Sequence, residues 1–168
     1  MTGSRTLLLL RHGKAESPTG IADRDRPLAG RGRRQSEHAG AACRASGVVP
    51  GLVVVSPALR ARETWVEFAR GLGVEPEIDI DRRVYANTIE DLLDVITGTP
   101  GELDTLMIVG HNPSIGDLSR LLDEDESRRR GTAVADGYPT GALTIFDLDV
   151  PWALVGAGTG RLRAVVRR

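Results

Sequence analysis

Short apolar runs alternate with longer amphipathic stretches along this chain. The apolar runs are bounded by charged or turn-forming residues, and each predicts a strand. They lie at 6–11, 52–56, 105–111, 142–148 and 162–166. Helical periodicity predicts helices at 31–46, 58–73, 89–96 and 114–122. Helices therefore separate the first three strands and follow the third, whereas no helix separates the last two strands.

The predicted strands carry apolar residues on both faces, as "TLLLLR" (6–11) and "LVVVS" (52–56) show. Strands of this kind are typical of a mostly parallel sheet that helices cover on both sides. We therefore expect an α/β fold, a three-layer α/β/α sandwich around a central, mostly parallel sheet. The last two strands are expected to pair antiparallel at an edge. A length of 168 residues suits a single domain, 1–168.

Composition excludes several classes of partner. The formal net charge is -1, so nothing points to a nucleic acid or an anionic membrane surface. The apolar run near the N-terminus is too short for a signal peptide or a membrane span. A single cysteine, Cys43, cannot form an intramolecular disulfide and fits a reducing compartment. We therefore expect a cytoplasmic protein. The charge run at 123–131 predicts a solvated loop or, alternatively, a rim that meets a partner.

Cationic and imidazole groups follow each of the first three predicted strands. Arg11, His12 and Gly13 come at the end of the first strand, Arg60 begins the helix after the second, and His111 ends the third. These groups should converge, because the carboxyl ends of parallel strands meet at one edge of a sheet. Guanidinium forks bind phosphate oxygens, and imidazole can attack phosphorus or donate a hydrogen bond. The pattern predicts a site for a tetrahedral dianion.

No metal or cofactor site is predicted. The three histidines are far apart in the sequence, and Cys43 has no ligand-like neighbours. His38 falls in the middle of a predicted helix and is interpreted as an ordinary surface histidine.

Four segments resemble the motifs of the histidine phosphatase superfamily, also called phosphoglycerate-mutase-like. They are Arg11-His12-Gly13, then Pro27, Leu28, Gly32 and Gln35, then Ser56, Pro57, Arg60 and Thr64, and finally Gly110 to Pro113. Within the superfamily the chain is most similar to SixA-type phosphohistidine phosphatases. That likeness rests on the stretches 25–32, 84–93 and 138–143 and on the short length.

The resemblance implies a role for each matching residue. His12 would be the nucleophile that takes the phosphoryl group, and Arg11 and Arg60 would hold its oxygens. His111 would hydrogen-bond the same group, and Gly13 and Asn112 would line the substrate site. The resemblance implies that no metal and no cofactor take part.

The general acid of the superfamily is missing here. Many members carry a glutamate three residues before an aromatic residue; the aromatic residue is Tyr85 here, and Arg82 takes the acid position. Another branch uses an aspartate just after the second histidine, where this chain has Asn112. Glu16 or Asp23 could substitute. An imidazole leaving group needs less help than an alkoxide, because it can already carry a proton near neutral pH.

The sequence therefore predicts a metal-independent phosphatase that forms a covalent phosphohistidine intermediate. Its expected partner is a phosphorylated substrate, above all a histidine-phosphorylated domain of a signalling or phosphotransfer protein. Two alternatives stay open. One is a small-molecule phosphatase of the same superfamily, and the other is a non-catalytic phosphate-binding module.

Overall fold

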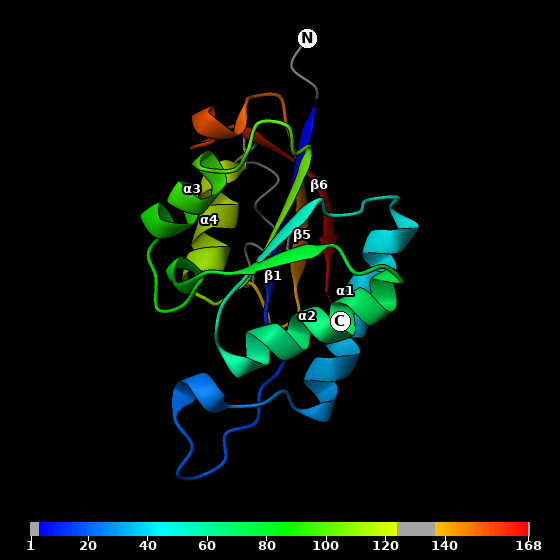
Figure 1. The fold of residues 1–168 in the computed structure, drawn as a ribbon, viewed down its shortest axis with the longest axis vertical. Helices are drawn as coiled ribbons and strands as arrows, with labels where there is room; N and C mark the ends of the chain where they lie inside the picture. The colour runs from blue at the N-terminus through cyan, green and yellow to red at the C-terminus, as the bar shows by residue number, and fades with distance from the viewer. Residues whose placement is uncertain (1–3, 124–136, 168) are drawn as a thin grey trace.

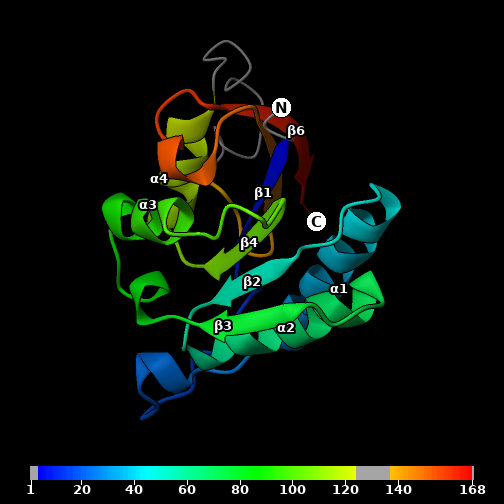
Figure 2. The same ribbon diagram turned by 45° about the horizontal axis from the view of Figure 1, so that its top comes forward.

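A computed structural model describes residues 4–123 and 137–167, and within them a six-stranded sheet lies between two pairs of helices (Figure 1). The strands are β1 Arg5–Arg11, β2 Leu52–Val55, β3 Glu77–Ile80, β4 Thr105–Gly110, β5 Leu143–Leu148 and β6 Gly160–Val166. The helices are α1 Gly30–Ala45, α2 Leu59–Leu72, α3 Ile89–Thr97 and α4 Ser114–Leu122. Helices α3 and α4 cover one face of the sheet, and α1 and α2 cover the other (Figure 2). The predicted three-layer sandwich is confirmed.

The strand order is β3-β2-β4-β1-β5-β6. The pairs β1–β4, β2–β4 and β2–β3 are parallel, whereas β5 runs antiparallel to both β1 and β6. The expected antiparallel pairing of the last two strands is thereby confirmed. Strand β3 is a correction to the predicted set, because no strand was expected at 77–80. All four of its residues are exposed, so no buried apolar run marks it in the sequence.

The four leucines of β1 form the middle of the fold. Leu7 and Leu9 belong to the apolar core under α3 and α4, while Leu8 and Leu10 belong to the core under α1 and α2. Successive side chains of a strand point to opposite faces, so an unbroken apolar run suits a strand with a core on each side. Each of these leucines is fully buried, which contributes about 1.5–3 kcal/mol per side chain.

Main-chain hydrogen bonds hold the carboxyl ends of the three central strands level. The parallel register pairs Arg11 of β1 with Gly110 of β4. Beyond the strands, the His12 N–H donates to the Gly110 carbonyl at 3.0 Å, and the Ser56 N–H donates to the Val109 carbonyl at 3.0 Å. The chain segments that follow β1, β2 and β4 therefore leave the sheet side by side.

Two other predictions concern surface features. His38 is exposed on α1, as expected. Within the charge run 123–131, Asp123 is buried and the other residues lie outside the described part of the chain. In residues 4–123 and 137–167 no helix is both long enough and apolar enough to span a membrane.

Candidate active site

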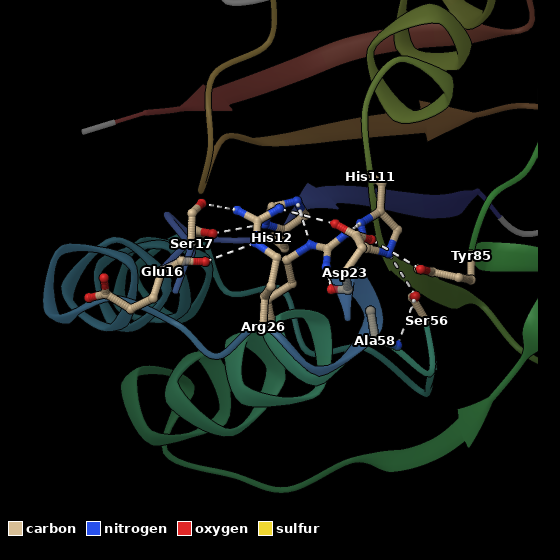
Figure 3. Close-up of polar contacts among 11 residues, drawn as sticks. His12, Glu16, Ser17, Asp23, Arg26, Ser56, Ala58, Tyr85 and His111 are labelled. Carbon is tan, nitrogen blue, oxygen red and sulfur yellow. Dashed lines mark hydrogen bonds and ion pairs between the residues drawn. The ribbon is translucent and has the colours of Figure 1, made fainter. Parts of the chain in front are cut away.

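Three of the predicted residues meet at the carboxyl edge of the sheet. Arg60, in the first turn of α2, donates from Nε to His12 Nε2 at 3.3 Å and lies 3.4 Å from His111 Nδ1 through Nη2. The rings of His12 and His111 are 5.0 Å apart between centroids. Figure 3 shows the side chains of His12, Asp23 and His111 gathered at this edge of the sheet. The predicted convergence of strand ends is therefore seen in the geometry.

The imidazole of His12 has a defined tautomer. Its Nδ1 lies 2.8 Å from the Gly13 carbonyl, which can only accept, so Nδ1 carries the proton. Nε2 therefore presents a lone pair toward Arg60. Burial lowers the pKa of His12 to about 4, helped by the positive charges of Arg60 and Arg11 and opposed by the bond to Gly13. At neutral pH the ring is uncharged, and the lone pair of Nε2 accepts the hydrogen bond from Arg60.

Thr64 joins the loop after β1 to the helix that carries Arg60. The Gly13 N–H donates to Thr64 Oγ1 at 3.0 Å, and Thr64 Oγ1 donates to the Arg60 carbonyl at 2.6 Å. All three groups are buried, where unpaired polar atoms are costly. This relay gives a physical reason for the threonine of the third motif. It also engages the N–H of Gly13, a residue that the resemblance places in the substrate site.

Gly32 and Gln35 of the second motif shape the same loop from the start of α1. A Cβ on Gly32 would collide with the Lys14 carbonyl, and a Cβ on Gly13 would lie 2.5 Å from the Gly32 carbonyl. Only glycine permits this close approach of two main chains. Gln35 Oε1 accepts from the Lys14 N–H at 3.0 Å. Gly32 and Gln35 therefore fix the main chain of residues 13–14, directly after His12.

Arg11 and Asn112 both contact the main chain near Tyr138. Arg11 Nη1 donates to the Tyr138 carbonyl at 2.9 Å, and Asn112 Nδ2 donates to the Gly137 and Tyr138 carbonyls at 2.9 and 3.0 Å. The amide donors of Asn112 are thus engaged with this segment. Arg11 Nε is buried without a partner in the described residues. A buried polar atom without a partner is uncommon in folded proteins and calls for a structural or functional reason.

Asp23 occupies the guanidinium fork of Arg60. Nη2 donates to Asp23 Oδ2 at 3.0 Å, and Nη1 donates to the Asp23 carbonyl at 2.6 Å. Tyr85 donates from its hydroxyl to the same Oδ2 at 3.0 Å, and Arg26 donates to Oδ1 at 3.1 Å. Burial opposes ionisation, but the hydrogen bonds from Arg60, Arg26 and Tyr85 lower the pKa of Asp23 to about 2. A carboxylate therefore accepts from the guanidinium of Arg60 in this structure (Figure 3).

The two positions expected for a general acid hold none. Arg82 is exposed in a short 3-10 turn, Arg82–Val84, and Asn112 holds the 137–138 segment. Glu16 is exposed, and Figure 3 shows its carboxylate turned away from His12. Of the two substitutes that the sequence left open, the structure brings only Asp23 to the site.

His111 is anchored by Ser56, a contact that sequence reasoning missed. His111 Nε2 lies 2.7 Å from Ser56 Oγ, and both side chains are buried. The edge of the Tyr85 ring packs against the imidazole, with centroids 5.6 Å apart. Burial lowers the pKa of His111 to about 3, and the charges of His12, Arg60 and Arg11 act in the same direction. The ring is neutral at physiological pH.

The site as a whole places two neutral imidazoles around the guanidinium of Arg60, each with an unprotonated nitrogen toward it. Guanidinium groups such as that of Arg60 have the donor geometry that a tetrahedral anion can accept from. In the described residues no group of three or more His, Cys, Asp or Glu side chains is placed to hold a metal ion.

Comparison with known proteins identifies the family of this chain. The sequence profile of the histidine phosphatase superfamily (branch 1) matches residues 7–83, the stretch that holds the first three motifs. A protein of Mycobacterium tuberculosis (strain ATCC 25618 / H37Rv), itself uncharacterised, is 30% identical over 155 residues, which are 91% of this chain and 96% of the relative.

Solved structures add a likeness over the full length. The protein assigned as the phosphohistidine phosphatase SixA of Agrobacterium tumefaciens is 25% identical with a TM-score of 0.83, covering 98% of both chains. The protein assigned as SixA of Nakamurella multipartitia is 26% identical with a TM-score of 0.80, covering 98% of this chain and 96% of that one. The motifs meet at one edge of the sheet, and these relatives match nearly the whole chain. The chain therefore belongs to the histidine phosphatase superfamily and is SixA-like.

Proposed function

We propose that this phosphatase removes the phosphoryl group from phosphohistidine in a signalling or phosphotransfer protein, through a phosphohistidine intermediate on His12. The observation that carries the proposal is the unprotonated Nε2 of His12, held 3.3 Å from Nε of Arg60 at the mouth of the sheet. A nucleophile beside a guanidinium suits phosphoryl transfer, which depends mainly on positioning and on neutralising oxygens.

The reaction takes two displacements. In the first, His12 Nε2 attacks phosphorus, the bond to the leaving group breaks, and the leaving group keeps the bonding electrons. In the second, water attacks the phosphorylated His12 and releases inorganic phosphate, with a proton passing to solvent. Arg11 and Arg60 hold the phosphoryl oxygens in both steps, so the contact between Arg60 and Asp23 must give way when substrate binds.

The absence of a placed acid supports the choice of substrate. Asp23 is ionised, Glu16 points away, and Arg82 and Asn112 cannot protonate an alkoxide. An imidazole leaving group departs without such help. The likeness to SixA-type proteins supports a histidine-phosphorylated protein domain as the partner. Catalysis without a metal and a cytoplasmic location complete the proposal, the latter favoured by the single cysteine.

A series of substrates with graded leaving-group basicity tests this function. We expect single-turnover rates to be high for a phosphohistidine protein and for phosphoramidate, intermediate for aryl phosphates, and low for phosphoserine and glycerol phosphate. General acid catalysis is typically worth about 10²–10⁴-fold, so its absence should make the fall in rate steep. Chelators should leave every rate unchanged.

Asp23→Asn and Glu16→Gln are the matched variants for this series. The steep dependence should survive in both. A flat series in the parent protein that becomes steep in Asp23→Asn would identify Asp23 as an acid and favour a small-molecule phosphatase. Absence of turnover on every substrate, with phosphate still bound, would favour a non-catalytic phosphate-binding module.

A further inference from the structure

His12, Arg60 and His111 form the group of side chains that we call the clamp. The nitrogen of His111 that faces Arg60 carries no proton. Arg60 lies 3.4 Å from His111 Nδ1, and a guanidinium can only donate, so Nδ1 accepts. The proton of the neutral ring is therefore on Nε2, which donates to Ser56 Oγ at 2.7 Å. Ser56 Oγ also accepts from the Ala58 N–H at 3.3 Å. Two donors thus occupy the two lone pairs of this buried hydroxyl.

This arrangement does not suit a bound phosphoryl group. Phosphoryl oxygens accept hydrogen bonds, so a lone pair on Nδ1 would repel them. His111 must place a proton on Nδ1 before it can hold the anion. The ring could take up a second proton, or it could move its one proton from Nε2 to Nδ1.

The surroundings of His111 oppose a second proton. Burial and the positive charges of Arg60 and Arg11 disfavour an imidazolium, and the carboxylate of Asp23 favours it. Asp23 accepts a hydrogen bond from the same Arg60 guanidinium that an entering anion would use. Because burial lowers the pKa of His111 to about 3, the ring that an entering anion meets is neutral at pH 7.

Ser56 offers the alternative. A hydroxyl can accept or donate after a rotation of its O–H, and Ser56 Oγ can keep the Ala58 N–H in either state. We propose that Ser56 is a positioning residue that lets His111 exchange its ring proton from Nε2 to Nδ1 when an anion enters the clamp. Nε2 gives one proton to water and Nδ1 takes one from water, so the ring stays neutral while Ser56 changes from acceptor to donor. The inference rests on the proposed function only in placing an anion between His12, Arg60 and His111.

The chain is well suited to a direct test, because it has only three histidines. Nitrogen-15 NMR of the imidazoles reports which ring nitrogen carries a proton. Tungstate is the probe, because it remains a dianion near pH 8 and brings no proton of its own. We expect Nδ1 of His111 to be unprotonated in the free protein and protonated in the complex, with Nε2 changing in the opposite sense. Exposed His38 provides an internal reference.

Variants test the part played by Ser56. Ser56→Ala should weaken tungstate binding about fivefold, the change in Kd that corresponds to the roughly 1 kcal/mol of one hydrogen bond. Ser56→Thr, which keeps a hydroxyl, should restore most of the affinity and the tautomer exchange. Ser119→Ala is the matched control, because Ser119 is a fully buried serine whose hydroxyl lies 3.3 Å from Thr144 Oγ1. It should bind tungstate as the parent does.

The outcomes separate this inference from the proposed function. If tungstate shifts the His12 signals while Nδ1 of His111 stays unprotonated, or while both nitrogens become protonated, the neutral exchange is wrong even though the clamp binds anions. A normal exchange in Ser56→Ala would remove Ser56 from the account. If no histidine signal responds to tungstate, the clamp itself fails, and the proposed function fails with it.

Discussion

Arg60 is the residue on which most contacts of the candidate site converge. Its guanidinium donates to His12 and Asp23 and lies beside His111, while its carbonyl accepts from Thr64. A buried arginine of this kind is held in one orientation before substrate arrives, which is what a preorganised donor requires. We therefore expect the phosphoryl clamp to depend on its planar fork and not only on its charge.

Arg60→Ala should lower kcat/KM by about 10²–10³-fold, the usual effect of removing one preorganised oxyanion donor. Arg60→Lys should recover only part of that loss, because an ammonium group cannot form the planar fork. Steady-state kinetics on a phosphohistidine protein measure both. Arg62→Ala, an exposed arginine on the same helix, is the control and should behave as the parent. Full activity in Arg60→Lys would show that a point charge is enough.

The pH dependence of kcat/KM follows from His12. Its pKa is lowered to about 4, so the nucleophilic neutral form dominates above that pH and is lost as the pH falls through it. The acid limb should therefore lie near pH 4, well below the ordinary histidine value of about 6.5. The substrate also ionises, so its pKa is measured separately and the pH profile of kcat/KM is corrected for it. An acid limb near pH 6.5 that belongs to the enzyme would contradict the buried, neutral His12.

The sequence identified the chemical groups of the site better than their partners. Strand ends and motifs marked Arg11, His12, Arg60 and His111, and the geometry brings the last three together. The contact of Asp23 with Arg60 spans 37 residues and depends on the path of the loop after β1. No periodicity encodes that path.

At the scale of elements, a glycine at their contact lets the main chains of α1 and α2 approach closely. A Cβ on Gly40 of α1 would lie 2.9 Å from the main-chain nitrogen of Leu72 and closer still to the Phe68 carbonyl. In an open helix, alanine is favoured over glycine by about 1 kcal/mol. Here the steric conflict with a neighbouring main chain outweighs that preference, because neither helix can move without disturbing the core between them.

Gly40→Ala should therefore destabilise the protein by about 1–3 kcal/mol, the usual cost of overpacking. Gly30→Ala, at the exposed start of the same helix, should leave stability unchanged or slightly raise it, since its Cβ would meet only the end of the Arg34 side chain at 3.7 Å. Urea unfolding midpoints measure both effects. A higher midpoint in Gly40→Ala would mean that the two helices separate easily.

The elements that sequence reasoning found and the one it missed differ in burial. The predicted strands and helices have apolar faces that the core requires, and their observed ends lie within a residue or two of the prediction. Strand β3 has only Ile78 and Ile80 as apolar residues, and both are about half exposed. Its main-chain pairing with β2 defines it, and main-chain pairing leaves little trace in side-chain pattern.

At the scale of the whole molecule, the sheet turns distant motifs into one site. The order β2-β4-β1 places the three motif-bearing strands side by side and parallel, so their carboxyl ends deliver Arg60, His111 and His12 to one edge. This much follows from the general behaviour of open α/β sheets. The tautomers of the imidazoles and the carboxylate on the Arg60 fork follow only from the folded geometry.

The central claim is that His12 itself becomes phosphorylated, and trapping the intermediate tests it most directly. Rapid quenching with a substrate labelled in its phosphoryl group should yield a protein adduct that survives base and is lost in acid, as a phosphohistidine does. Mass spectrometry should place the label on His12. The adduct should be absent from His12→Ala and present in His38→Ala, which lacks only the exposed histidine. An adduct and near-normal turnover in His12→Ala would contradict the account.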